Sequence, residues 1–397
     1  MSITNHHHVY LVPGMFGFGQ LAGYDYFQHV KSALSPHYWN AGLDVSFHDV
    51  PSPPTSSLRE RSRVLKNTIL HTAGTQGPIH ILGHSTGGLD ARLALAPTVH
   101  VGVGQELLSW RARVATLVSI NTPHYGTPLA SYFATVSGAR MLYALSVLTA
   151  VSLRLSAPSL ALLSRLLSAV GNIDSLLGGD LKLFSRATDG ILRFVDQDGR
   201  REITEYLSKV RTDQGAIIQI SPEAMDLFNA AVENAEHVRY GWVAAAAPPP
   251  SSLKAAKKVR GPYMAMTAAL YTTLYQITSQ HHERYGYARP SAAELKTIVE
   301  ALGKTPTDEH NDGIVPTLSM IWGKMIWAEE ADHLDTLGHF YDDQKPVIHT
   351  DWLTSGAHIN RSRFLRMMSK IAEFQINGAL AKAPSSGHHQ RPDPYPA

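Results

Sequence analysis

The ten residues 79–88, IHILGHSTGG, decide how this sequence is expected to fold. Residues 79–82 form a short apolar run rich in β-branched side chains, which is typical of a strand buried on both faces. Two glycines then bracket Ser85, and a helical pattern follows over 86–95 and stops before Pro97. The stretch therefore predicts a strand, a tight turn and a helix in immediate succession.

The same alternation extends outward through the first third of the chain. Short apolar runs at 9–12, 45–47 and 114–120 predict three more strands, and a helical pattern covers 57–71. Strands that alternate with helices in this way form a parallel sheet covered by helices on its faces. We therefore expect an α/β fold with a mostly parallel, doubly wound sheet.

The pattern changes after Pro128. Residues 131–183 are dense in Leu, Ala and Ser and predict a helical insertion. Within it, 141–183 predicts a mobile lid, because the segment holds more leucine than one buried helix face can use. Its most apolar part, 141–153, is bounded by arginines and is too short to cross a membrane.

The rest of the chain divides into shorter pieces. The proline-rich residues 244–258 predict a surface loop, and a helical pattern returns at 263–280. Residues 383–397 have almost nothing to bury and predict a mobile tail. We expect residues 1–382 to form a single α/β domain that carries the helical insertion.

Composition excludes several classes of function. The chain has 397 residues, 44% hydrophobic and 17% charged, with a formal charge of +2, so we expect no nucleic-acid partner. The absence of cysteine excludes disulfides, thiolate metal sites and a cysteine nucleophile. Residues 1–8 carry no signal-peptide pattern, so a cytoplasmic location is the default expectation, with secretion left open.

Gly83-His84-Ser85-Thr86-Gly87 fits the nucleophile elbow G-x-S-x-G, which needs a strand before it and a helix after it. The turn is so tight that the positions two residues before and after the serine, Gly83 and Gly87, must be small, and Ser85 is pushed clear of the sheet. Its hydroxyl lies above a helix N-terminus, where partial positive charge favours a developing oxyanion. Ser85 is the predicted nucleophile, and the Thr86 N–H is one predicted oxyanion donor.

A second oxyanion donor must come from the loop after an early strand. Residues 11–19, LVPGMFGFG, form a glycine-rich bend at that place, and the Met15 N–H is the candidate. The bend lacks the Gly-Lys-Ser/Thr ending of a phosphate-binding loop and the glycine spacing of a dinucleotide site. We therefore interpret it as part of an oxyanion hole.

A serine hydroxyl needs a base, and in this arrangement the partners follow in the order serine, acid, histidine. Asp312 lies in the turn Asn311-Asp312-Gly313-Ile314-Val315-Pro316, directly before an apolar run, and is the candidate acid. The nearby Asp308 and Glu309 lack such a turn. Among the 21 histidines, His333 and His339 remain as candidate bases, and the residues alone leave the two level.

Several segments together resemble the bacterial true lipases of the α/β-hydrolase superfamily, the group related to calcium-containing secreted triacylglycerol lipases. The matching segments are 83–88 (GHSTGG), 121–126 (NTPHYG), 311–315 (NDGIV), 333–335 (HLD) and 357–361 (AHINR). The resemblance implies an α/β-hydrolase fold with an inserted helical lid. It also implies that His333 is the catalytic base, because His-Leu-Asp supplies that residue in the family.

The sequence departs from this family in ways that bear on its metal. The family's first calcium ligand precedes a proline, and Arg289 stands at the matching place before Pro290. The second ligand survives as Asp335, and a further one is replaced by His339. We therefore expect no metal site, with an ion pair between Arg289 and Asp335 in place of calcium. The alternative is that Arg289 is surface charge and that Glu294 or Asp308 completes a calcium site. The oxyanion loop also has Pro13 where the family usually has histidine.

These observations predict a carboxylic ester hydrolase of the triacylglycerol lipase type, acting through Ser85, His333 and Asp312 without a cofactor. Its expected partner is a lipid or another acyl-ester substrate, met at a lipid-water interface. An acyltransferase or a polyester hydrolase would use the same acyl-enzyme and remains an alternative. A noncatalytic binding protein is a third reading, which covalent labelling of the serine would contradict.

Overall fold

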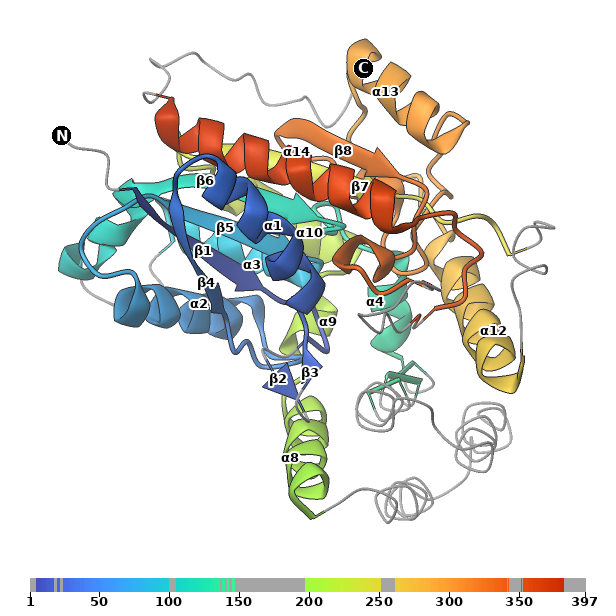
Figure 1. Ribbon diagram of the computed structural model, residues 1–397. Coiled ribbons are helices and arrows are strands. Elements are labelled where there is room, and N and C mark those ends of the chain that lie inside the picture. The colour runs from blue at the N-terminus through green and yellow to red at the C-terminus, as the bar shows by residue number, and fades with distance from the viewer. Residues whose placement is uncertain are drawn as a thin grey trace.

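A six-stranded parallel sheet runs through the centre of the protein, with strand order β4-β1-β5-β6-β7-β8 (Figure 1). The structure, a computed structural model, describes residues 5–17, 20–21, 24–99, 105–135, 138–139, 141–142, 145–146, 197–250, 261–340, 342, 351 and 353–381. In sheet order the strands are Asp44–Asp49, His6–Val12, Ile79–His84, Val114–Ile120, Arg239–Ala245 and Lys324–Glu329. A separate antiparallel pair joins β2 (Gln20–Leu21) and β3 (Tyr24–Asp25).

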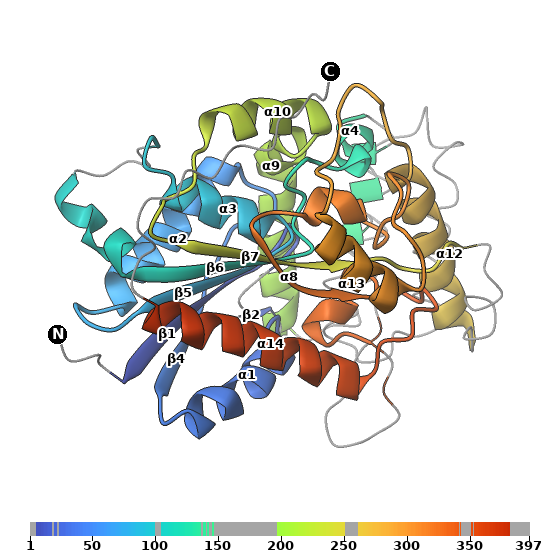
Figure 2. The ribbon, with the colours of Figure 1, turned by 90° about the horizontal axis from the view of Figure 1, so that it is seen from above.

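Helices cover both faces of the sheet, as Figure 2 shows from above. On one face α1 (Gln28–Asn40) packs against α14 (Arg361–Leu380), and on the other α2 (Leu58–Thr72) packs against α3 (Thr86–Leu95). Every residue of β5 is buried, as expected for a central strand covered on both sides. This two-sided cover is why the early strands appear in the sequence as continuous apolar runs.

The other described helices lie in the segments that connect β6 to β7 and β7 to β8. They are α4 (Pro128–Phe133), α8 (Gln197–Thr212), α9 (Gly215–Gln219), α10 (Pro222–Ala231), α12 (Gly261–Thr278) and α13 (Ala292–Leu302). Short 3-10 turns lie at Gln105–Arg113, Thr317–Met320 and Asp335–Leu337. In Figure 1, α8 and α12 extend away from the sheet.

The expected α/β architecture is confirmed, and each of the four expected strands lies within an observed one. The sheet also continues into β7 and β8, which the sequence analysis did not expect. Its prediction of a surface loop at 244–258 is wrong at the beginning, because residues 244–247 are at most 2% exposed. Ala244 and Ala246 pack against Trp242, so a run of alanines serves here as the small-residue end of a central strand.

The expected helical insertion is described only in part. Helix α4 ends at Phe133, and most of 131–183, with almost all of the predicted lid at 141–183, lies outside the described residues. The predicted tail at 383–397 and the remainder of the predicted loop, 251–260, also lie outside them. Among the helices that the structure describes, none combines the length and apolarity that a membrane span requires.

Candidate active site

Ser85 lies at the sharp turn between β5 and α3, where its backbone adopts φ 54° and ψ −129°. A non-glycine residue with positive φ is strained, and such strain persists only where the surroundings hold it. A Cβ at Gly83 would lie 2.5 Å from the Gly88 nitrogen, and one at Gly87 would lie 2.1 Å from the Val12 carbonyl oxygen. Only glycine fits at these two positions, so the sequence pattern and the turn geometry explain each other.

The loop after β1 packs directly on Ser85. A Cβ placed on Gly14 would lie 2.6 Å from the Ser85 Cβ and 3.2 Å from its Oγ. The backbone N–H groups of Met15 and Thr86, the two predicted oxyanion donors, have no hydrogen-bond acceptor among the described residues. Both N–H groups therefore remain available to bind an oxygen beside Ser85.

The side chain of Arg61, on α2, is bonded to the loop after β1. Its Nη2 donates to the carbonyl oxygens of Pro13 (2.6 Å) and Gly14 (3.3 Å), and its Nε donates to Asp90 Oδ2 at 2.9 Å. The Arg61 and Asp90 side chains are fully buried. Burial raises the pKa of Asp90 to about 6, while the Arg61 charge acts in the opposite direction. Arg61 was not among the site residues predicted from the sequence. Its only sequence signal is its position, as a charged residue on the apolar face of a helix.

His333 and Asp312 form the closest acid-histidine pair of the site. His333 Nδ1 lies 2.6 Å from Asp312 Oδ2, and the two side chains are 7% and 0% exposed. The other carboxylate oxygen, Oδ1, accepts from the N–H groups of Ile314 (2.9 Å) and Val315 (2.7 Å). The turn that carries Asp312 therefore fixes the carboxylate before it meets the histidine.

The backbone of His333 is tied to the elbow. His84, the residue before Ser85, donates from Nε2 to the His333 carbonyl oxygen at 2.9 Å, and Asn121 Nδ2 donates to the same oxygen at 3.3 Å. Burial lowers the pKa of His84 well below its ordinary value, and the nearby His333 adds to this effect. A neutral His84 accepts from the Tyr26 hydroxyl at Nδ1. No described hydrogen bond joins the Ser85 hydroxyl to His333.

No known family model matches the chain, and no curated protein matches it. Among solved structures, the chain is similar to Staphylococcus hyicus lipase with a TM-score of 0.51 and 16% identity, covering 96% of this chain and 97% of that one. The chain has the α/β-hydrolase fold. The hydrolase fold places Ser85 on the turn after β5 and His333 on the loop after β8.

Two further structures are similar at lower TM-scores. EstA from Clostridium botulinum gives 0.48 with 18% identity, covering 92% of this chain and 88% of that one. A metagenomic carboxyl esterase gives 0.46 with 16% identity, covering 95% and 77%.

His339, the other candidate base, lies beside Tyr26 and His29. Its Nε2 lies 3.4 Å from the Tyr26 carbonyl oxygen, and its ring packs edge-on against His29. The structure therefore brings His333, and not His339, to Asp312. The sequence alone could not separate them, because the choice depends on how the loop after β8 folds back.

The expected ion pair between Arg289 and Asp335 is not formed. Arg289 instead makes a bidentate pair with Asp308, with Nη1–Oδ1 and Nη2–Oδ2 distances of 2.9 Å each, and its side chain is 62% exposed. Asp335 is 3% exposed and lies beside two other carboxylates. The proposed replacement of calcium by a guanidinium therefore has no basis in this structure.

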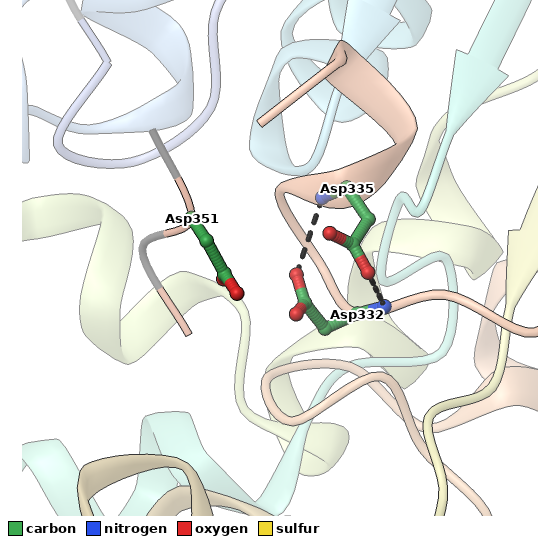
Figure 3. Close-up of side chains that lie close together, drawn as sticks. All are labelled: Asp332, Asp335 and Asp351. Carbon is green, nitrogen blue, oxygen red and sulfur yellow. Dashed lines mark hydrogen bonds between the residues drawn. The ribbon is translucent and has the colours of Figure 1, made fainter. Parts of the chain in front are cut away.

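Asp332, Asp335 and Asp351 form a carboxylate cluster next to His333 (Figure 3), with one oxygen from each within 4.8 Å of the others. Asp335 Oδ2 accepts from the Asp332 N–H at 2.9 Å. Burial raises the pKa of Asp332 to about 6, and burial together with the Asp332 charge raises that of Asp335 well above its ordinary value. Carboxylate oxygens are the donors that calcium prefers, so this donor set fits a calcium ion.

Proposed function

We propose that the protein is a serine-dependent carboxylic ester hydrolase that acts on acyl esters of the triacylglycerol type. The bond from His333 Nδ1 to Asp312 Oδ2 carries the proposal, because it leaves Nε2 to take a proton. The backbone of the same histidine is bonded to His84, one residue before Ser85. The proposed nucleophile, the histidine and its carboxylate lie on three separate loops, and the bonds from His84 to His333 and from His333 to Asp312 support their assignment to one site.

In the first half of the proposed reaction, Ser85 Oγ attacks the ester carbonyl carbon and His333 Nε2 takes its proton. The Met15 and Thr86 N–H groups stabilise the oxyanion of the tetrahedral intermediate. The carbon–oxygen bond of the ester then breaks, and the leaving alcohol takes the proton from His333. The product of this half is an acyl ester of Ser85.

In the second half, His333 takes a proton from water, and the resulting hydroxide attacks the acyl carbon. Collapse of this second intermediate returns the proton to Ser85 and releases the carboxylic acid. Asp312 accepts the bond from His333 Nδ1 throughout and so orients the His333 ring. A calcium ion bound by Asp332, Asp335 and Asp351 would hold the loop of His333 in place, and the reaction itself uses only the groups named above.

An apolar cluster next to the site supports an acyl substrate. Met15, beside Ser85, and Ile314, two residues after Asp312, both pack against it. Its buried members include Leu129, Phe133, Ile217, Leu274 and Leu353. An acyl chain that lies against Met15 and Ile314, the partly buried side chains beside the site, gains about 0.8 kcal/mol for each methylene group it buries, so longer acyl chains are expected to bind more tightly.

The experiment is a series of p-nitrophenyl esters of increasing chain length, assayed below and above the solubility limit of each ester. Wild-type protein should hydrolyse them, and Ser85→Ala should lower kcat by at least about 10⁴-fold with an unchanged circular dichroism spectrum. Equal activity of the two proteins would contradict the proposal. Transfer of the acyl group to an added alcohol in preference to water would identify an acyltransferase instead.

A further inference from the structure

Residues 14–17 form a tight turn whose third residue is unusual. The Gly17 N–H donates to the Gly14 carbonyl at 3.0 Å, which closes a four-residue turn. Phe16, its third residue, has φ 62°, and Met15 is not among the residues with positive φ. This is the pattern of a type II turn, in which glycine or asparagine normally occupies that third position. A phenylalanine there is strained by about 1–3 kcal/mol.

Both backbone polar groups of Phe16 are bonded to other parts of the fold. Its N–H donates to the Pro54 carbonyl oxygen at 2.9 Å, and its own carbonyl accepts from the Tyr206 hydroxyl at 3.0 Å. The neighbouring residue in this turn is Met15, whose N–H is the proposed oxyanion donor. The Tyr206 bond restrains the Phe16–Gly17 peptide unit, and the Gly17 N–H of that unit donates to the Gly14 carbonyl, which belongs to the same peptide unit as the Met15 N–H.

Tyr206 is itself firmly placed. It lies on α8, is 5% exposed, and belongs to the same core cluster as Leu11 of β1. Burial raises the pKa of Tyr206, so the hydroxyl remains protonated and can donate at every working pH. The residue after α8 is also bonded to the segment before α2, because Thr55 Oγ1 donates to the Asp213 carbonyl oxygen at 2.5 Å. The buried ring of Tyr206 and the bond at the residue after α8 thus hold the hydroxyl beside the turn.

We propose that Tyr206 is a positioning residue for ester hydrolysis, which holds the strained Phe16 turn so that the Met15 N–H faces the oxyanion. The inference rests on the proposed function of Ser85. Without the Tyr206 hydroxyl, the Phe16–Gly17 peptide unit loses the bond at its carbonyl, and its Gly17 N–H holds the Gly14 carbonyl less firmly. Since the Gly14 carbonyl and the Met15 N–H belong to one peptide unit, the oxyanion donor is then held less firmly, which weakens binding of the transition state more than binding of the substrate.

The test compares Tyr206→Phe with Tyr38→Phe. Tyr38 is a matched control, because it is fully buried in the same core cluster and its hydroxyl donates to Gln375 Oε1 at 3.0 Å. Loss of either hydrogen bond should lower the melting temperature by a similar small amount. Only Tyr206→Phe should lower kcat, by about 3- to 10-fold, and the rate of phosphonylation by a fluorophosphonate, with KM changed less than about 2-fold.

Repeating the Tyr206→Phe substitution in a Phe16→Gly variant separates a positioning role of Tyr206 from a role in overall stability. Glycine adopts positive φ without strain, so in Phe16→Gly the turn no longer needs the Tyr206 hydroxyl. Adding Tyr206→Phe to Phe16→Gly should therefore change kcat by less than about 2-fold. Equal losses in the two backgrounds, or a wild-type kcat for Tyr206→Phe, would overturn the inference.

The same assays distinguish this inference from the function it rests on. If wild type hydrolyses esters, Ser85→Ala does not, and Tyr206→Phe matches wild type, the positioning role alone is wrong. If wild type hydrolyses no ester and Ser85 is not phosphonylated, the proposed function and this inference are both wrong.

Discussion

Histidines lie at both ends of the central sheet, and their partners differ. At the carboxyl end, His333 is bonded to the carboxylate of Asp312. At the amino end, His7 Nδ1 lies 3.0 Å from His80 Nε2, and His8 Nδ1 lies 3.2 Å from His48 Nε2. One end pairs a histidine with an acid, whereas the other pairs histidines with each other.

The comparison shows that the partner decides what a buried histidine can do. A histidine beside a carboxylate can gain a proton with its new charge compensated, which a catalytic base requires. A histidine buried against another histidine resists protonation, and burial followed by the charge of His6 lowers the pKa of His7 to about 4. We therefore interpret the amino-end histidines as structural.

The largest effect is expected from removing His333, the histidine that is paired with an acid. His333→Ala should lower kcat by about 10⁴-fold or more, as much as loss of the nucleophile, because triad members act as a unit. His339→Ala should retain most of the activity, because His339 contacts the Tyr26 carbonyl oxygen and not Asp312. Ester hydrolysis by the two purified variants measures this difference, and the reverse result would show that the base is misassigned.

The sequence predicts those parts of the site whose signal lies within a few adjacent residues. The elbow around Ser85 and the turn around Asp312 are each contained in a few adjacent residues, so composition and spacing reveal them. His333 needed the family resemblance, because its distance from Asp312 depends on a loop after β8. Arg61 and Tyr206 were missed for the same reason, since each acts on a loop more than 45 residues away.

The expectations about the fold and its charges failed where long-range pairing decides the structure. The pairing of β7 with β6 and β8 buries alanines that precede a run of prolines, and the local pattern of that segment indicates a loop. A run of three histidines at residues 6–8 has the local pattern of a solvated segment, but His7 and His8 are 2% and 8% exposed because β1 lies between β4 and β5. Arg289 pairs with Asp308 from a loop whose path the sequence did not reveal.

The next prediction concerns the carboxylate cluster beside His333. Calcium in about 100-fold excess over its dissociation constant should stabilise the protein by about 2.7 kcal/mol, which raises the melting temperature by a few degrees. Asp335→Asn should remove most of this rise, whereas Asp308→Asn, in the exposed pair with Arg289, should retain it. Equal melting temperatures of wild type in chelator and in calcium would contradict a calcium site here.

The smallest expected effect concerns the amino end. Because the pKa of His7 is lowered, the unfolded chain binds more protons than the folded protein, and stability falls as the pH decreases from about 6.5 toward 4. Asp90, whose pKa is raised to about 6, acts in the opposite direction, so variants must be compared with wild type.

Urea unfolding at pH 7 and pH 5 isolates the histidine contribution. His7→Gln should reduce the loss of stability between these pH values by about 1 kcal/mol, after allowance for solvent screening, and should leave kcat at pH 7 unchanged. His71→Gln, at the exposed end of α2, serves as the control and should behave as wild type. An unchanged pH dependence in His7→Gln would show that the amino-end histidines do not control acid stability.

The central claim is that Ser85 is a nucleophile activated by His333. Its most direct test is reaction with a fluorophosphonate, followed by mass spectrometry of the intact protein and of its peptides. The account predicts one adduct per chain, located on Ser85, that forms quickly in wild type and at least about 10³-fold more slowly in His333→Ala. An unlabelled Ser85, or labelling at the same rate in His333→Ala, would contradict it.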